Sequence, residues 1–150
     1  PHESYADRRT SAAVGRYSGS VWEQHFPYVR PQENANKVDV RWVALRDEDG
    51  HGLLAVGQPL LSISAWQYEL SDLEDVEGTQ RHSVDVRPRD LITLNLDLRQ
   101  MGVGGDNSWG ARPLAQYMIP AAEYRYRYRL VPLSPDDDPA ELGRMRPRAR

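Results

Sequence analysis

Alternation of apolar and polar positions, the pattern expected of β-strands, dominates the chain. In residues 37–45, Val38 and Val40 share one face, because successive side chains of a strand point to opposite sides of the sheet. A turn-rich run at 47–52 follows, and apolar residues resume at 53–56. This arrangement predicts a β-hairpin. Further strands are predicted at 60–68, 91–97 and 124–130.

The predicted strand at 124–130 alternates tyrosine with arginine. Tyr124, Tyr126 and Tyr128 fall on one face and the arginines on the other. We therefore expect the tyrosines to pack on a core and the arginines to meet solvent or acidic neighbours. The alternative is a surface that binds single-stranded nucleic acid through interleaved aromatic and basic side chains. It is disfavoured because the two kinds of side chain point to opposite faces.

The remaining segments complete a mostly antiparallel β domain at residues 1–133. A capping-box pattern at 71–74 with Gly78 beyond it predicts one short helix at 70–77. The glycine-rich run 99–110 is predicted to be a loop. Residues 134–150 lack the apolar surface needed to fold alone and are predicted to be a disordered tail. Four separated tryptophans are candidates for a sandwich core: Trp22, Trp42, Trp66 and Trp109.

Composition narrows the class of protein. The 150 residues carry 19 basic and 22 acidic side chains, a net charge of -3, which argues against a dedicated nucleic-acid binder. No apolar run approaches the roughly 18 residues of a membrane span. The absence of cysteine excludes disulfides and Cys-based zinc sites. The sequence begins at Pro1 without a signal peptide, so we expect a piece of a longer, cytoplasmic protein.

No complete catalytic or metal-binding motif is present, so the sequence assigns no catalytic and no metal-ligating residue. Gly102-Val103-Gly104 begins like a dinucleotide-binding loop, but Asn107 stands where the third glycine belongs. Phosphate-binding and nucleophile-elbow motifs are missing, and the four histidines are scattered. Each acidic residue is interpreted as solvated surface, which is where most acids lie.

Three stretches are more specific than any of these motifs. They are Pro1-His2-Glu3-Ser4-Tyr5-Ala6-Asp7-Arg8; Tyr28-Val29-Arg30-Pro31-Gln32-Glu33-Asn34 with the strand after it; and Thr93-Leu94-Asn95-Leu96-Asp97 followed by Gln100-Met101-Gly102-Val103-Gly104-Gly105-Asp106-Asn107-Ser108-Trp109. In this order and spacing they resemble the C-terminal (small-chain) domain of the large bacterial β-galactosidases of glycoside hydrolase family 2. The resemblance covers residues 1–133.

The resemblance implies a fold for this segment, and it implies which functions of the enzyme lie in other domains. The fold is all-β: an antiparallel β-sandwich, the second half of a galactose-mutarotase-like supersandwich, with one short helix. The parent enzyme hydrolyses terminal non-reducing β-D-galactose residues in β-D-galactosides such as lactose, with retention. Its two catalytic glutamates lie in a separate upstream barrel, and its Mg²⁺ and Na⁺ ions are held mainly outside this segment. The expected partners are the rest of a homo-oligomeric enzyme and the galactoside, and the segment alone is expected to be inert.

One substrate-binding residue is carried over by the resemblance. Trp109 matches the tryptophan that this domain contributes to the rim of the galactose site, where an indole can cover the apolar face of a sugar. The alternative is an ordinary core tryptophan. Residues around it are interpreted as loop-shaping rather than as sugar contacts: Gly102, Gly104, Gly105, Asp106 and Asn107.

Other parts of the matched stretches receive structural interpretations. The run 31–34 is predicted to form a rigid turn whose side chains satisfy backbone groups, with a place near the active-site mouth as the alternative. Ala35 stands where the family commonly has glycine, so a positive φ there would be strained. Glu3, Asp7 and Arg8 are expected to form a partly buried polar network. The competing function is a stand-alone, non-catalytic carbohydrate-binding β-sandwich module.

Overall fold

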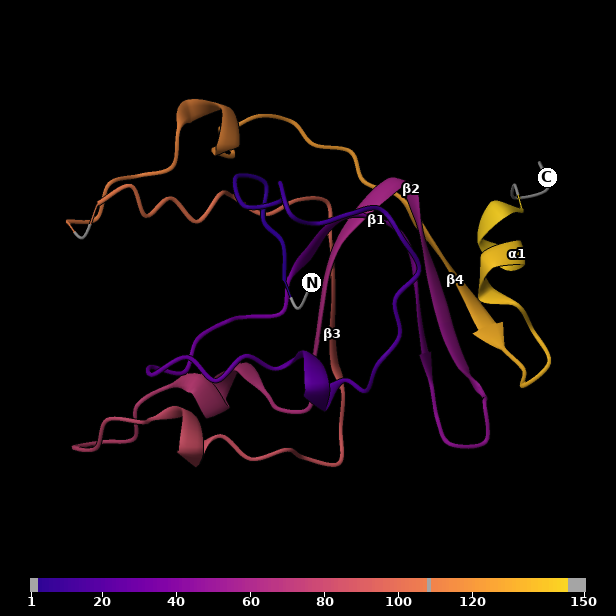
Figure 1. Ribbon diagram of the computed structural model, residues 1–150, viewed down its shortest axis with the longest axis horizontal. Coiled ribbons are helices and arrows are strands. Elements are labelled where there is room, and N and C mark those ends of the chain that lie inside the picture. Colours follow the sequence, from indigo (N-terminus) through magenta and orange to yellow (C-terminus); the bar gives the residue numbers. More distant parts are fainter. Residues whose placement is uncertain (1–2, 108, 146–150) are drawn as a thin grey trace. The chain divides into compact units, whose positions relative to one another are not determined.

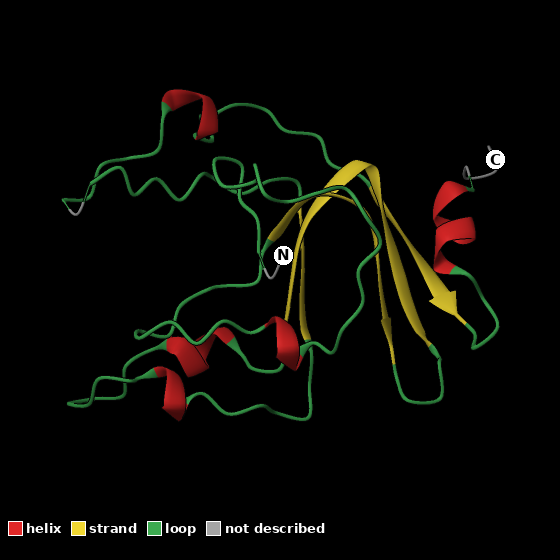
Figure 2. Cartoon of the chain, viewed as in Figure 1, coloured by secondary structure: helices red, strands yellow, loops and turns green. Residues whose placement is uncertain are grey.

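A computed structural model describes residues 3–107 and 109–145, and these form an all-β chain with one antiparallel sheet (Figures 1 and 2). The 15-residue strand β2 (Gly52–Trp66) is central: its later half pairs antiparallel with β3 (Thr93–Asp97) and its earlier half with β4 (Tyr128–Leu133). Strand β1 (Lys37–Arg46) is the remaining neighbour of β2. The helices are α1 (Pro139–Arg144) and the 3-10 helices η1 (Trp22–Gln24), η2 (Leu70–Leu73), η3 (Ser83–Asp85) and η4 (Ala115–Tyr117).

The antiparallel sheet and the single short α-helix confirm the predicted all-β class, as do the hairpin at 37–56 and the strand within 91–97. The separate strand predicted at 60–68 is wrong in one respect, because β2 runs through 53–56 and 60–66 without a break. The backbone folds closely on itself at Gly57, where a Cβ atom would lie 2.7 Å from the carbonyl carbon of Leu60. Glycine at this position lets the strand continue on both sides.

The helix predicted at 70–77 is only the four-residue η2. A capping box does form, but between Glu69 and Asp72. In an α-helix, the carbonyl of Asp72 would accept a hydrogen bond from the amide four residues later in the sequence. That carbonyl instead accepts a hydrogen bond from Arg81 Nη1 at 3.1 Å, and Glu74 already has extended backbone.

The described residues divide into two compact units, each with its own core. The first comprises residues up to Val38 and from Ser62 to Pro120. Its buried cluster is Trp66, Tyr68 and Val86, with Trp22 and Leu73 packed against it. The second comprises Asp39–Leu61 and the residues from Ala121 on. Its buried cluster is Leu54, Val56 and Leu133, packed by Trp42, Ala44, Val131 and Leu142. The candidate site lies entirely within the first unit.

Within β4, the prediction for the tyrosine–arginine segment is wrong about which face is buried; before the strand, Tyr126 is partly buried and its neighbours Arg125 and Arg127 are exposed, as predicted. Strand β4 begins only at Tyr128, and the side chains of Tyr128 and Leu130 are 43% and 49% exposed. The pairing with β2 sets Val131 opposite Leu54 and Arg129 opposite Val56, two residues of the second core. Because directly paired residues point to the same side, the odd-numbered positions of β4 face the core.

The segment predicted to be a disordered tail contains α1. Asp138 caps the helix by accepting from the Ala140 amide at 2.9 Å, and Pro139 occupies a position in the first turn where its missing N–H costs nothing. Leu142 packs on the second core, and Arg46 donates to the carbonyls of residues 135 and 137. These tertiary contacts stabilise a helix too short to persist alone. Residues 146–150 lie outside the described part.

Across the described ranges, every helix is too short and too polar to serve as a membrane-spanning segment.

Candidate functional site

The glycine-rich loop after β3 is held by two residues from the start of the chain. The carboxylate of Asp7 accepts hydrogen bonds from the amides of Val103 and Gly104, at 3.0 Å to Oδ1 and 2.9 Å to Oδ2. The guanidinium of Arg8 donates to the carbonyl oxygen of Gly104. Residues 7 and 8 therefore bind both the donors and an acceptor of the loop backbone. We call this set of contacts the clasp.

The glycines of the loop are required by its geometry. At Gly102 a Cβ atom would lie only 2.6 Å from Oδ2 of Asp7, so the carboxylate can reach the loop only because the side chain is absent. Gly104 and Gly105 have φ values of 66° and 86°, which strain other residues. The amide of Gly102 also donates to the carbonyl of Tyr117 at 2.8 Å. The predicted loop is thus an ordered structure with defined contacts.

Trp109 stands at the end of this loop with its side chain in solvent. Asn107 Oδ1 accepts from the amides of Trp109 and Ala111 at 2.9 and 3.3 Å, a turn that fixes the backbone on both sides of the indole. Trp109 is 91% exposed, so it is not a core residue of this chain. Asp106 is also exposed, and Ser108 lies outside the described residues.

The other three tryptophans occupy the positions expected of core residues. Trp66 is 5% exposed, and its Nε1 donates to the carbonyl of Asn34 at 2.8 Å. Trp22 and Trp42 each pack against a buried cluster of their own unit. Trp109 therefore differs from them in exposure as well as in the motif that contains it.

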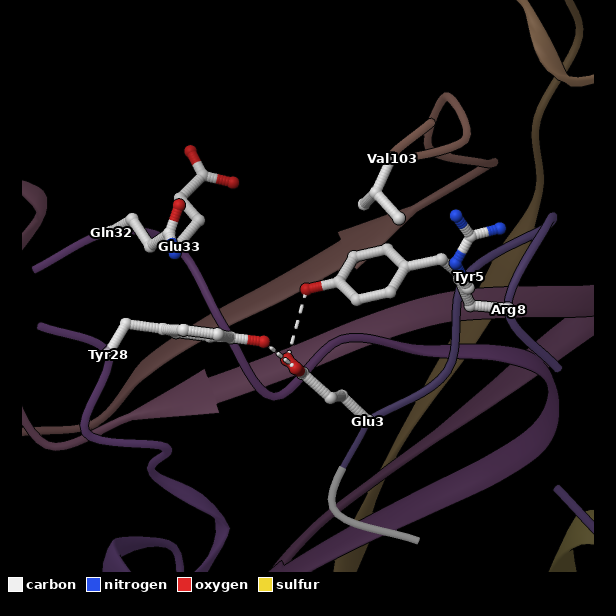
Figure 3. A pocket seen from close by; sticks show the side chains of 7 residues that line it. All are labelled: Glu3, Tyr5, Arg8, Tyr28, Gln32, Glu33 and Val103. Atoms are coloured by element: carbon white, nitrogen blue, oxygen red, sulfur yellow. Dashed lines mark hydrogen bonds between the residues drawn. The ribbon is translucent and has the colours of Figure 1, made fainter. Parts of the chain in front are cut away.

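A cavity of about 480 Å³ lies beside the loop in the same unit (Figure 3). It is lined by side chains from the N-terminal segment, the run before β1 and the loop: Glu3, Tyr5, Arg8, Tyr28, Gln32, Glu33 and Val103. A neighbouring cavity of about 220 Å³ is lined by Asp7, Arg8, Gly104, Asp106, Leu114 and Tyr117. Arg8 belongs to both cavities, which places the clasp between them.

Glu3 organises the floor of the larger cavity. Its carboxylate accepts from the hydroxyl of Tyr5 at 3.1 Å, from the hydroxyl of Tyr28, and from the amide of Ala35 at 2.9 Å. Figure 3 shows the hydroxyl groups of both phenols directed at this carboxylate. Glu3 is thus engaged by three donors and supports the cavity wall.

The pKa shifts of Tyr5, Tyr28 and Asp7 agree with their roles as hydrogen-bond donors and acceptor. The hydrogen bond to Glu3, together with burial, raises the pKa of Tyr28 to about 12, and burial beside Glu3 raises the pKa of Tyr5 further. Both phenols therefore stay protonated donors near neutral pH. Burial acts to raise the pKa of Asp7, but the amides of Gly104 and Val103 and the charge of Arg8 outweigh it. The net pKa of Asp7 is lowered, so its carboxylate is ionised near neutral pH and accepts the two loop amides as an anion beside the positive Arg8.

The residues of the run 31–34 make two kinds of contact, and its alternative interpretation, a place near the active-site mouth, stays a prediction. Asn34 is buried; its Oδ1 accepts from the amide of Phe26 at 3.0 Å, and its Nδ2 donates to the Tyr68 hydroxyl at 2.9 Å. This is the structural role expected of a rigid turn. Gln32 and Glu33 instead line the larger cavity. Ala35 has a φ of 63°, as the comparison with glycine suggested.

The expected network of Glu3, Asp7 and Arg8 is two separate arrangements, one around Glu3 and one at the clasp. Sequence reasoning missed Tyr5 and Tyr28 as partners of Glu3. Both stand within the stretches quoted for the resemblance, and that was the only available signal. The described residues contain no cluster of three or more His, Cys, Asp or Glu side chains suited to a metal. What this surface offers chemically is binding through hydrogen bonds and aromatic faces.

Comparison with known proteins agrees with the motif-based resemblance. The profile of the family described as β-galactosidase small chain matches residues 1–130. The chain is 40% identical over 134 residues to a β-galactosidase of Priestia megaterium, covering 89% of this chain and 13% of that protein. It is 35% identical to a β-galactosidase of Vibrio cholerae and 38% identical to the β-galactosidase BgaC of Bifidobacterium adolescentis, covering 87% and 81% of this chain.

The match to these relatives is confined to a small part of each. The chain spans 12% of the Vibrio cholerae protein and 11% of the Bifidobacterium adolescentis protein. With a family profile extending over residues 1–130 and an antiparallel β fold, the chain belongs to the β-galactosidase small-chain family.

Proposed function

We propose that this chain is a non-catalytic segment of a β-galactosidase of glycoside hydrolase family 2, and that it supplies Trp109 to the sugar-binding site. The parent enzyme hydrolyses terminal non-reducing β-D-galactose residues in β-D-galactosides such as lactose. The observation that carries the proposal is the 91% exposure of Trp109 on a hydrogen-bonded loop, in a chain of this family. An exposed indole offers an apolar face to a ligand and keeps its N–H for a polar partner.

The physics of stacking defines what Trp109 contributes. A galactose ring has an apolar C–H face, which an indole covers while the hydroxyl groups keep polar partners. By analogy with aromatic pairs, the contact is worth about 0.5–1.5 kcal/mol beyond the burial of area. That amount positions a substrate and performs no chemistry. Gly102, Gly104, Gly105, Asp106 and Asn107 shape the loop.

The catalytic carboxylates belong to the rest of the enzyme in this proposal. Retaining hydrolysis needs two carboxyl groups about 5–5.5 Å apart, one as nucleophile and one as acid/base. In the cavity, Glu3 is engaged by three donors, and at the clasp Asp7 is engaged by two backbone amides. These groups are suited to hold structure. The chain alone is therefore expected to lack hydrolytic activity.

The partners follow from the same proposal. The chain works with the remainder of the β-galactosidase, in a cytoplasmic homo-oligomer, and with the galactoside that Trp109 contacts. Mg²⁺ and Na⁺ are assigned to the remainder of the enzyme. Nucleic acid is not an expected partner at a net charge of -3.

A second candidate function rests on the exposure of Trp109 by itself. An exposed tryptophan on a hydrogen-bonded loop also suits a stand-alone carbohydrate-binding module, with no enzyme attached. The two candidates differ in what the encoding gene contains. A catalytic barrel in the same reading frame, or an adjacent gene for a large subunit, supports the enzyme.

Substitution of Trp109 in the complete protein tests the proposed function. For Trp109→Ala we expect the KM for a chromogenic β-galactoside to rise about 2- to 13-fold, the equivalent of the stacking energy above. Trp109→Phe, which keeps an aromatic face, should retain part of the affinity. Val84→Ala is the control, because Val84 is also exposed but lies in η3, outside the loop. An unchanged KM in Trp109→Ala contradicts the proposal, as does rapid turnover by the purified 150-residue chain.

A further inference from the structure

We propose that Asp7 is a positioning residue for substrate binding, acting through the clasp to hold the loop that presents Trp109. The inference deepens the proposed function and rests on it, since it concerns the same sugar-binding surface. Asp7 lies 96 residues before Val103 in the sequence, yet its carboxylate accepts the amides of two successive loop residues. One side chain thus fixes the backbone at the start of the loop.

The contacts of the clasp restrain the loop in more than one direction. Asp7 holds the amides of Val103 and Gly104, while Arg8 holds the carbonyl of Gly104. The positive φ of Gly104 turns the chain at this point. Hydrogen bonds with an ionised partner are stronger than neutral ones, and all three contacts of the clasp are of this kind; two of them are made by the carboxylate of Asp7.

The fit of Gly102 shows that the loop and the carboxylate are matched in shape. A Cβ at residue 102 would approach Oδ2 of Asp7 to 2.6 Å and the Cβ of Tyr117 to 2.9 Å. A longer carboxylate at residue 7 has the same difficulty, because the loop backbone already touches the shorter one. The clasp therefore needs aspartate and glycine together, and charge alone is insufficient.

A second anchor transmits this restraint to the indole. From Gly104 the chain continues through Asn107, whose Oδ1 accepts from the amides of Trp109 and Ala111. Ala111 in turn lies against Gly104: a Cβ at Gly104 would be 3.1 Å from the carbonyl oxygen of Ala111. The backbone that follows Trp109 thus returns to Gly104, the residue held by the clasp. A displacement of Gly104 is therefore expected to displace the loop backbone that carries Trp109.

The test uses Asp7→Asn in the complete protein, with Asp90→Asn as the matched control, because Asp90 is an exposed aspartate away from the loop. Asparagine keeps the size of the side chain but replaces one acceptor oxygen by a donor. We expect hydrogen exchange at the amides of Val103 and Gly104 to become at least about tenfold faster in Asp7→Asn, since hydrogen bonds to charged groups are lost. Asp90→Asn should leave both rates unchanged.

Kinetics then link the clasp to the indole. We expect Asp7→Asn to raise the KM for the galactoside toward the value of Trp109→Ala with little change in kcat. The KM of the double variant should be no higher than that of Trp109→Ala alone, because both substitutions remove the same contact between the indole and the sugar. Asp7→Glu should fail to restore the KM, and Gly102→Ala should reproduce the effect of Asp7→Asn from the opposite side of the clasp.

The outcomes separate this inference from the proposed function. Unchanged amide exchange in Asp7→Asn overturns the clasp, whatever Trp109 does. Fully additive effects of Asp7→Asn and Trp109→Ala on KM also overturn it, because Asp7 would then act independently of the indole. Faster exchange together with an unchanged KM in Trp109→Ala supports the clasp and overturns only the proposed function.

Discussion

Ala35 holds a backbone conformation that usually favours glycine. It is 1% exposed, its amide donates to Glu3, and its φ of 63° lies in the left-handed region. A non-glycine residue there costs about 1–2 kcal/mol, because Cβ crowds the following carbonyl. The amide that helps to hold Glu3 at the floor of the cavity is thus presented from a strained backbone.

Because of this strain, we expect an alanine-to-glycine substitution to cost less free energy of unfolding at Ala35 than at an unstrained buried alanine. Ala35→Gly loses a buried methyl, about 0.8 kcal/mol, and adds flexibility to the unfolded chain, but it relieves the strain. We expect a free energy of unfolding within about 0.5 kcal/mol of the parent chain. Ala55→Gly is the matched control: Ala55 is also 1% exposed but lies in β2 with ordinary φ, so a loss of about 1.5 kcal/mol is expected. Urea unfolding measures both, and equal losses would show that Ala35 stores no strain.

Elements were predictable from the sequence where their signal is local. The hairpin of β1 and β2 and the strand β3 follow from alternation and turn residues alone. The buried face of β4 does not follow from the local pattern, because it is set by pairing with β2 residues that lie 71 to 81 positions earlier, and Tyr128 and Leu130 are therefore exposed. The glycine loop was predicted from composition, whereas its restraint by Asp7 depends on a contact across 96 residues. Long-range pairing is what the one-dimensional pattern does not contain.

Helix α1 was missed because its stability comes from the surface it covers. Leu142 packs against Leu54, Val56 and Leu133, and its carbonyl accepts from Arg129 Nη2 at 2.6 Å. A Cβ at Gly143 would lie 2.9 Å from the ring of Trp42, so the helix sits close to the sheet. This segment lies beyond the residues that match the family profile, yet it completes the core of the second unit.

The packing of α1 predicts the cost of truncating its apolar anchor. For Leu142→Ala we expect a loss of about 2 kcal/mol in the free energy of unfolding, at the low end for leucine because the side chain is only half-buried. Glu141→Ala, on the exposed side of the same turn, should change it by less than about 0.5 kcal/mol. Urea unfolding followed by tryptophan fluorescence, to which Trp42 contributes, makes the comparison. Equal effects of the two substitutions would mean that α1 does not stabilise the unit.

At the scale of the whole molecule, the described residues leave considerable apolar surface uncovered. Val29, Val84 and Trp109 are each more than half exposed, and β4 presents Tyr128 and Leu130. The sequence predicted a sandwich, whereas residues 3–107 and 109–145 supply one sheet. Relatives are about eight times longer than the matched segment, with coverage of 11–13% in the three compared above. Surface of this kind agrees with a segment that functions alongside the remainder of a β-galactosidase.

The exposed face of β4 predicts that the isolated chain associates with itself. Among the described strands β4 pairs only with β2, so it leaves one edge and an apolar face open, a combination that favours strand-to-strand contact. Sedimentation of the purified 150-residue chain should therefore show a mass that rises with concentration. Replacing Tyr128 and Leu130 by threonine keeps strand propensity and removes apolar area, and it should return the chain toward the monomer. Val84→Thr, at an even more exposed apolar position outside the sheet, should leave the association unchanged. A wild-type chain that stays monomeric throughout would show that this face is not adhesive, and association that persists in the threonine variant would place the contact elsewhere on the surface.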